Sequence, residues 1–141
     1  MNFTSPIFLD TAPIIYFVEE NSVFGETSKK ILSALMHQQA ALHSSHLTLS
    51  EVLIKPIKTQ NSALITKYSS FFQDLPNFRF SFFDRSTAIL TAQIRAKYDF
   101  RLADSANLAL AVESGCKTFL TNDRNLKPFP DLKVTLLSEL S

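Results

Sequence analysis

The residues PIFLDTAPIIYF, positions 6–17, set a pattern that recurs along the chain: a short apolar run ends abruptly at Asp10, and a second run begins after Pro13. A brief apolar run that ends at a turn signal is typical of a parallel strand covered on both faces. Thr11 and Pro13 favour the start of a helix, because proline already has the φ that a first turn needs. We therefore predict a buried strand that places the Asp10 carboxylate at its carboxyl end. The alternative is that Asp10 or Thr11 only caps the following helix.

The composition indicates one globular domain. The chain has 141 residues, of which 45% are hydrophobic, and this is enough to bury most of its apolar surface in one domain spanning residues 1–141. The formal charge of +1 creates no overall field that would indicate a nucleic-acid or membrane partner, so such a partner must be inferred from local groups.

Several classes of protein are excluded by single residue types. Cys116 is the only cysteine, which excludes an internal disulfide and a multi-cysteine zinc site and fits a reducing compartment. The first apolar run has no preceding Lys or Arg, and no stretch approaches the ~20 apolar residues of a spanning helix, so we expect a cytoplasmic protein. The only glycines, Gly25 and Gly115, cannot form a dinucleotide-binding turn, a P-loop or a serine-hydrolase elbow.

Helical and strand patterns alternate along the chain. We expect strands in the ranges 6–9, 40–47, 78–83, 117–121 and 132–137, and helices in the ranges 11–18, 27–39, 48–56, 62–75, 85–98 and 104–114. This order predicts an α/β fold, a three-layer α/β/α sandwich with a mostly parallel sheet of four to five strands. In such folds, binding sites lie beyond the carboxyl ends of the strands, where the strand order reverses.

Some segments allow more specific expectations. Pro56 should end or kink its helix, and the strand at 78–83 should lie near a sheet edge. The helix that begins after Asp84 has two apolar stripes, which predicts burial on two sides. The phenylalanines between positions 71 and 83 fit a core better than a base-stacking platform, although exposed rings near Phe71 and Phe78 could bind a partner protein or a second copy.

Four acids follow this plan. Asp10 ends the first strand, Glu51 lies one helical turn beyond the second, and Asp123 follows the strand that ends at Thr121. Asp104 begins a helix of roughly 16 Å that feeds a strand of roughly the same length, so it should return to the same edge. We expect all four carboxylates at the carboxyl edge of the sheet.

Each acid also has a purely structural interpretation. Glu51 could complete a capping box with Thr48, Asp104 could favour the positive end of its helix, and Asp123 could organise a turn. However, no basic cluster in the sequence is placed to neutralise four such acids, and two carboxylates about 4 Å apart repel by roughly 4 kcal/mol at a dielectric of ~20. This pattern predicts a divalent cation with oxygen ligands, Mg²⁺ or Mn²⁺, which can activate water for phosphodiester hydrolysis.

With these acids in place, the chain resembles the PIN-domain nucleases, in particular the VapC-like toxins of bacterial toxin–antitoxin pairs. The resemblance rests on the ordered segments FLDTAPIIYFVE, LTLSEVLIKPI, RLADSANLALAVESG and FLTNDRNL, which together span nearly the whole chain. One departure is Ala103, where relatives frequently have proline before the acid. That change loosens a turn and alters no ligand.

The resemblance implies a metal-dependent endoribonuclease that is neutralised by a small antitoxin bound to a toxin dimer. It implies that Asp10, Glu51, Asp104 and Asp123 bind the catalytic metal, with Glu51 either a ligand or the group that orients water. Thr121 and Thr11 would support the site. Arg101, Arg124 and Lys55 are candidate contacts to RNA phosphates.

Other interpretations of the same residues remain open. The acidic rim could hold Mg²⁺ and a partner without cleavage, or the protein could be a housekeeping nuclease acting on RNA or DNA. His43 and His46 lie three residues apart, which on a strand places them on opposite faces, so we expect packing and no shared metal. We expect Cys116 to be a packed thiol and His37 to be exposed.

Overall fold

A parallel sheet of five strands forms the centre of the molecule. In the computed structural model, which describes residues 3–140, the strands are β1 (Ile7–Leu9), β2 (Leu42–Ser45), β3 (Phe78–Ser81), β4 (Thr118–Thr121) and β5 (Lys133–Leu136). Their order is β3-β2-β1-β4-β5, and every neighbouring pair is parallel. The predicted fold class is confirmed, as is the edge position of β3. Residues 1–2 and 141 of the expected domain lie outside the described part.

The strand order reverses between β1 and β4. From β1 the chain continues outward to β2 and β3, and then crosses to β4 and β5 on the other side. Leu9 pairs with Leu120, and the Asp10 backbone N–H donates to the Leu120 carbonyl at 3.0 Å. The end of β1 and the end of β4 are therefore adjacent, which is the place where open parallel sheets bind ligands.

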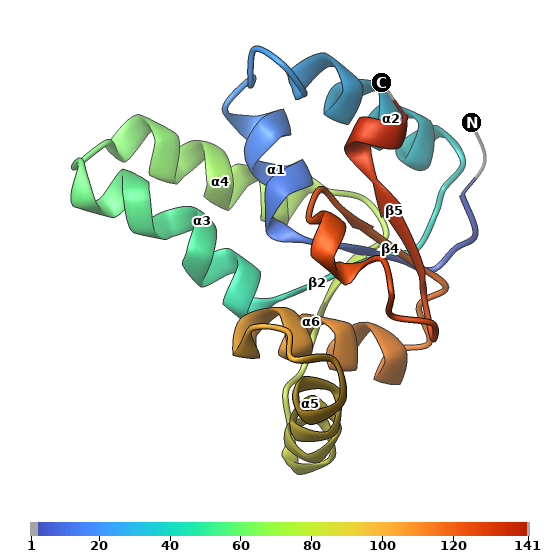
Figure 1. Ribbon diagram of the computed structural model, residues 1–141. Coiled ribbons are helices and arrows are strands. Elements are labelled where there is room, and N and C mark those ends of the chain that lie inside the picture. The colour runs from blue at the N-terminus through green and yellow to red at the C-terminus, as the bar shows by residue number, and fades with distance from the viewer. Residues whose placement is uncertain (1–2, 141) are drawn as a thin grey trace.

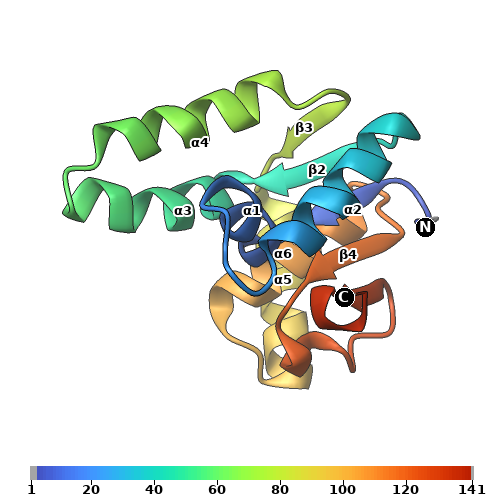
Figure 2. The same ribbon diagram turned by 90° about the horizontal axis from the view of Figure 1, so that it is seen from above.

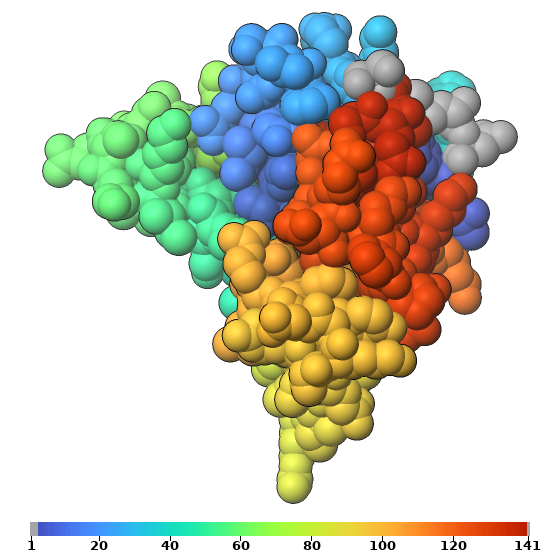
Figure 3. All heavy atoms as spheres, viewed as in Figure 1, coloured from blue at the N-terminus to red at the C-terminus, as the bar shows by residue number. Residues whose placement is uncertain are grey.

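Helices cover both faces of the sheet (Figures 1 and 2). The helices α1 (Thr11–Val18), α2 (Gly25–His37), α3 (His46–Lys58) and α4 (Ser62–Asp74) pack on one face, and α5 (Arg85–Tyr98) and α6 (Leu102–Glu113) cover the other, with two 3₁₀ turns, Arg124–Leu126 and Leu137–Glu139, near the C-terminus. The hairpin of α3 and α4 extends beyond the rest of the molecule, as the space-filling view shows (Figure 3).

Two apolar cores lie on the two faces of the sheet, because side chains alternate along each strand. Ile7 and Leu9 point to the core beneath α1–α4, whereas Phe8 points to the core beneath α5 and α6. The rings of Phe8 and Phe119 stack in that second core, with centroids 5.3 Å apart. Both faces of β1 are fully buried, so the strand has a fixed register.

Helix ends follow local signals in the sequence. The carboxylate of Asp84 caps α5, and Gly115 has a φ of 75° just after α6. The capping box expected for Thr48 and Glu51 is wrong: Ser45 is the cap of α3, and its hydroxyl oxygen accepts from the Thr48 N–H at 3.1 Å. The helix also does not end at Pro56 but continues two residues further, to Lys58.

One apolar surface expected to be buried is exposed. Of the two stripes on α5, the one with Leu90, Ile94 and Tyr98 packs on the core, but Ile89 in the other stripe is 55% exposed. The core assignment of two phenylalanines after β3 is also wrong, because Phe82 is 80% exposed and Phe83 is 51% exposed. These side chains form an apolar surface on the single chain.

Within residues 3–140, none of the helices has the length and apolar character needed to cross a membrane.

The contrast between buried and exposed phenylalanines provides a direct test of the core. We expect Phe8→Ala to lower the free energy of unfolding by ~3–5 kcal/mol, because it empties a fully buried ring position that stacks on Phe119. The matched change Phe82→Ala, measured at a protein concentration that keeps the chain monomeric, should alter it by no more than ~0.5 kcal/mol. Urea denaturation measures both values, and equal losses would contradict this packing.

Candidate active site

Asp10 is a buried carboxylate at the carboxyl end of β1, with 7% of its surface exposed. It occupies the cap position of α1, but its side chain makes no capping hydrogen bond, so the purely capping interpretation is not supported. Instead the Thr121 hydroxyl donates to Oδ2 at 2.7 Å, and the Asn107 amide donates to Oδ1 at 3.4 Å. Each carboxylate oxygen is thus held by a side chain from a different element.

The environment of Asp10 disfavours its charge. Burial raises its pKa from 3.8 to about 6; the hydrogen bonds from Thr121 and the Thr11 backbone oppose this rise, and the charges of Asp104 and Glu51 add to it. A carboxylate removed from water and repelled by two other acids is a group whose charge a cation would stabilise.

Asn107 was missed in the sequence. This side chain is 1% exposed in the middle of α6, and its Oδ1 accepts from the Ser45 hydroxyl at 2.6 Å, while its Nδ2 lies 3.3 Å from the Thr48 Oγ1. The available signal was an amide on the buried face of an alanine-rich helix, three residues after Asp104. Its partners come from β2 and α3, far away in the sequence, and the helical pattern alone does not reveal them.

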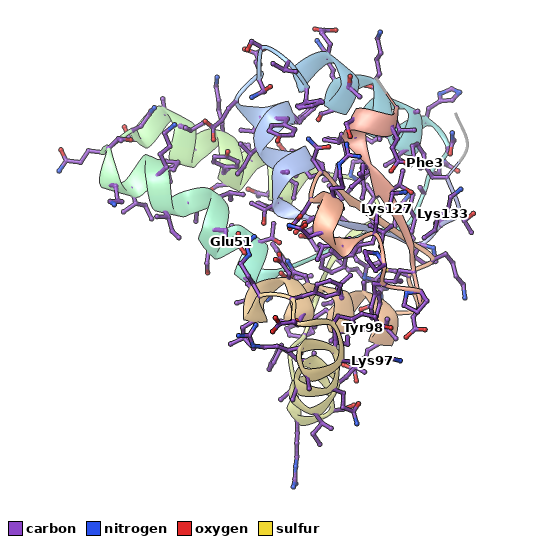
Figure 4. The ribbon with its side chains drawn as sticks, in the orientation of Figure 1. Phe3, Glu51, Lys97, Tyr98, Lys127 and Lys133 are labelled. Atoms are coloured by element: carbon purple, nitrogen blue, oxygen red, sulfur yellow. The ribbon has the colours of Figure 1, made fainter. Side chains whose placement is uncertain are left out.

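Glu51 projects from the first half of α3 toward the start of α6 (Figure 4). Its Oε2 lies 3.4 Å from the Thr11 hydroxyl, which also approaches the Thr48 hydroxyl at 3.5 Å. Partial burial raises the pKa of Glu51, and the nearby charge of Asp104 raises it further. Thr11 therefore connects Glu51 to the segment that begins with Asp10.

Arg101 is a basic neighbour of both Asp104 and Asp123. The Arg101 Nε donates to the Asp104 Oδ2 at 3.0 Å, and its Nη2 lies 4.0 Å from the Asp123 Oδ2. The sequence predicted no basic cluster around the acids, but the single side chain of Arg101 partly neutralises this pair. The hydrogen bond and charge of Asp104 raise the pKa of Arg101, although the Arg101 side chain is 83% exposed.

Asp123 has a structural role as well. Its Oδ1 accepts from the Asn125 N–H at 3.0 Å, which caps the 3₁₀ turn after β4, and its own N–H donates to the Thr121 Oγ1 at 3.1 Å. The turn interpretation of Asp123 is therefore confirmed, and it leaves the Oδ2 atom facing Arg101. Thr121 supports Asp10 and Asp123 at once, because it lies between them.

The remaining candidate phosphate contacts are exposed. Arg124 begins the 3₁₀ turn directly after Asp123, and Lys55 lies one helical turn after Glu51 on α3. Each of the two residues is close to one of the acids in the sequence. Lys55 makes neither a hydrogen bond nor an ion pair through its side chain among the interactions of the described residues.

The side candidates behave as packing groups. The His46 ring stacks on Phe80 with centroids 4.4 Å apart, while the His43 Nδ1 lies 3.4 Å from the Ser81 hydroxyl on the other face of the sheet. Cys116 is buried, which raises the pKa of its thiol to about 12, and His37 is exposed on α2. The expectations for all four residues are confirmed in this respect.

The acids offer the chemistry that a hard divalent cation needs, since all their donor atoms are carboxylate oxygens. As the side chains stand in residues 3–140, no three acidic, histidine or cysteine residues form a ready-made metal-binding group. Arg101 supplies positive charge to Asp104 and Asp123 in this arrangement. The donor set fits a metal, and Arg101 is the group that such a metal would have to displace.

Comparison with known proteins agrees with this arrangement. A sequence model of the PIN domain matches residues 7–132, which is most of the chain. The chain belongs to the PIN domain family. PIN domains are generally nucleases that bind divalent metal ions, and the predicted resemblance to this family is confirmed. A comparison with curated protein sequences found no match.

Solved structures with the same fold include several toxin–antitoxin complexes. VapBC2 from Rickettsia felis, bound to a promoter DNA fragment, has a TM-score of 0.76 at 15% identity, covering 92% of this chain and 97% of that chain. A toxin–antitoxin complex from Klebsiella pneumoniae has a TM-score of 0.71 at 18% identity, covering 93% and 97%. FitAcB from Neisseria gonorrhoeae has a TM-score of 0.67 at 22% identity, covering 95% and 99%. At these identities the likeness establishes the PIN fold.

The raised pKa of Asp10 predicts a pH dependence of stability without metal. A carboxyl whose pKa is about 6 in the folded state and 3.8 when unfolded stabilises the fold most below pH ~4, and this contribution is lost as the pH rises through 6. We therefore expect Asp10→Asn to become more stable than the unmodified protein as the pH rises from about 4 to about 7 in EDTA, by a difference on the order of 3 kcal/mol. Denaturant titrations at each pH measure this difference, and a difference independent of pH would refute the burial argument.

Proposed function

We propose that this single-domain chain is a divalent-metal-dependent endoribonuclease, with Mg²⁺ or Mn²⁺ as cofactor, and the toxin of a toxin–antitoxin pair in the cytoplasm. The observation that supports this most strongly is the position of Asp10, Glu51, Asp104 and Asp123 in a PIN fold. Asp10 and Asp123 follow β1 and β4, the two strands at which the sheet order reverses, and Asp104 and Glu51 are close enough to raise the pKa of Asp10.

The chain's own residues have distinct roles in this proposal. Asp10, Asp104 and Asp123 hold the cation directly or through water, and Glu51 either joins them or accepts a proton from the attacking water. The bound cation supplies charge stabilisation for the phosphate and lowers the pKa of water. The Thr121 hydroxyl orients the Asp10 carboxylate, and the Thr11 hydroxyl orients the Glu51 carboxylate. Glu51 suits the role of base because its pKa is raised.

Arg101 has a proposed role both in neutralising the acids and in binding the substrate. Its guanidinium neutralises Asp104 and Asp123 in the structure, and its side chain is largely exposed and free to turn outward. With a cation held by the acids, Arg101 would be available to contact an RNA phosphate, together with Arg124 and Lys55. Contacts from these three cations to phosphates would position the backbone of a strand without reading its sequence.

The nuclease proposal is tested on purified protein with a labelled RNA and Mg²⁺. Asp10→Asn should slow cleavage by about 100-fold or more, since a loss of ~3 kcal/mol of charge stabilisation has that effect on a rate. EDTA should abolish cleavage. Asp131→Asn, an exposed acid before β5 at the opposite edge of the sheet, is the control and should cleave normally. If all variants cleave equally, the activity does not come from these acids; if the protein binds metal but cleaves neither RNA nor DNA, a non-catalytic Mg²⁺-binding module is the better account.

A groove between α1, α2 and α4 is the proposed binding surface for the antitoxin. Its volume is about 840 Å³, and its apolar floor includes Phe17, Met36, Phe71 and Leu75. Phe17 and Phe71 approach with centroids 5.5 Å apart, so the floor is a firm aromatic surface. A groove of this kind fits the apolar face of a partner helix. The structurally similar proteins are toxin–antitoxin complexes, which supports an antitoxin as the occupant.

Substitution in this groove should separate neutralisation from catalysis. If a small protein is encoded beside this chain, Phe71→Glu should restore growth arrest in cells that also express it, because a charge on the groove floor opposes helix docking. Ile57→Glu, an exposed position on α3 outside the groove, should still be neutralised. Pull-down of the small protein provides a second readout. If both variants are neutralised equally, the antitoxin binds elsewhere, and if no such small protein exists, the housekeeping nuclease becomes the favoured alternative.

The exposed apolar surface formed by Phe82, Phe83 and Ile89 is the proposed contact with a second copy. These side chains are 80%, 51% and 55% exposed; Phe82 and Phe83 directly follow β3, and Ile89 lies in the first half of α5. An apolar surface of this kind on one chain is typical of a protein–protein interface. A symmetric dimer would bury both copies of this surface at once.

Light scattering after gel filtration tests the dimer. Ile89→Asp should lower the mass from that of a dimer to that of a monomer, because it places a charge in the apolar contact. Val23→Asp, at another exposed apolar position with 71% exposure, should leave the dimer intact. A monomeric mass for the unmodified protein at micromolar concentration would overturn this assignment.

A further inference from the structure

The buried amide of Asn107 contacts the segments that carry Asp10 and Glu51. Its Nδ2 lies 3.4 Å from the Asp10 Oδ1, at the end of β1, and 3.3 Å from the Thr48 Oγ1, in the first turn of α3. Its Oδ1 accepts from the Ser45 hydroxyl at 2.6 Å, at the end of β2. Asn107 itself belongs to α6, one turn after Asp104. One side chain therefore joins the elements that position Asp10, Glu51 and Asp104.

Its neighbours fix the orientation of this amide. The Ser45 oxygen already accepts from the Thr48 N–H, so its hydroxyl hydrogen is available for the short bond to the Asn107 Oδ1. The opposite orientation would place the amide oxygen against the Asp10 carboxylate, where two acceptors would repel. The Asn107 amide therefore presents its N–H groups to Asp10 and Thr48.

This orientation determines how Asp10 is held. Thr121 donates to one carboxylate oxygen and Asn107 to the other, which fixes the rotation of the carboxylate about its bond to Cβ. Each oxygen keeps a further lone pair for another partner. On the same helix face, Asp104 lies three residues before Asn107, so the attachment of Asn107 to β1 and β2 also sets the position of Asp104 above the rim.

We propose that Asn107 is a positioning residue that sets the metal affinity of the site, with Ser45 as the hydroxyl that orients it. The inference rests on the proposed function, because it concerns the same acids. Groups that orient ligands from outside commonly change metal affinity or activity by about 10–100-fold when they are removed. A buried amide that served only stability would affect unfolding and leave the affinity of the folded protein unchanged.

The test measures Mn²⁺ binding to the purified full chain by electron paramagnetic resonance, beside thermal unfolding of the metal-free protein. Asn107→Leu keeps the size of the side chain and removes its hydrogen bonds. We expect its Mn²⁺ affinity to fall at least about 10-fold. Thr118→Val is the control, because it removes a buried hydroxyl whose bond goes to the Thr4 carbonyl, away from the acids. It should lower the melting temperature and leave Mn²⁺ affinity unchanged.

A second pair of variants keeps the test decisive if Asn107→Leu does not fold. Ser45→Ala removes the cap of α3 together with the bond to Asn107, whereas Asn61→Ala removes the equivalent cap of α4 and nothing in the site. Only Ser45→Ala should weaken Mn²⁺ binding, and Ser45→Thr, which restores a hydroxyl, should recover it. Unchanged affinity in folded Asn107→Leu or Ser45→Ala would overturn the proposal.

Cleavage of RNA is recorded separately as a function of Mg²⁺ concentration. For a positioning role, Asn107→Leu should need more Mg²⁺ to reach half of its maximal rate. If the unmodified protein binds Mn²⁺ and Asn107→Leu weakens that binding, but neither cleaves RNA, the proposed nuclease function fails while the role of Asn107 stands. If the protein cleaves RNA and the variant has the same Mg²⁺ requirement, the proposed nuclease function stands while the role of Asn107 fails.

Discussion

The burial of the Asp10 carboxylate at the carboxyl end of β1 is the constraint on which the other polar contacts depend. A charge in this position, flanked by fully buried strand residues, must be compensated by hydrogen bonds or by a cation. Thr121 and Asn107 supply the hydrogen bonds from two different elements. These hydrogen bonds do not fully offset the unfavourable free energy of burying the charge, so the pKa of Asp10 is raised. A nearby positive ion would stabilise this charge. The burial and repulsion that make the charged Asp10 unfavourable for stability would also favour the binding of a cation.

The parallel topology brings the acids to the same place. Because β1 and β4 are adjacent and parallel, the residues that follow them share one edge of the sheet. The helix α3 begins directly after β2 at that edge, and α6 begins there before it runs back to the start of β4. The acids come from positions 10, 51, 104 and 123, so no local segment can form the site alone. Unfolding of any one crossover would separate them. None of the four acids lines the groove between α1, α2 and α4.

Much of the fold and the positions of the acids could be predicted from local patterns. Apolar runs that end in acids predicted the strands, and the matched lengths of α6 and β4 predicted the return of Asp104 to the rim. The ion pair between Arg101 and Asp123 and the hydrogen bonds of Asn107 could not be predicted in this way, because these partners depend on how separate elements pack. For Phe82 and Ile89, the apolar pattern predicted burial that the structure does not show, because a sequence pattern does not say whether another element of the chain covers the side chain. The cap of α3 was misplaced because Ser45 and Thr48 are both good cap residues, and only the backbone position decides between them.

The central claim is that these separated acids bind one catalytic cation in place of the Arg101 guanidinium. A crystal structure of the protein soaked with Mn²⁺, with anomalous diffraction recorded at the manganese edge, tests this claim most directly. The account predicts an anomalous peak in contact with Asp10 and at least one of Asp104, Asp123 and Glu51, with Arg101 turned away from Asp104. No peak at this edge under Mn²⁺ concentrations that support cleavage, or a peak elsewhere with the Arg101–Asp104 ion pair intact, would contradict it.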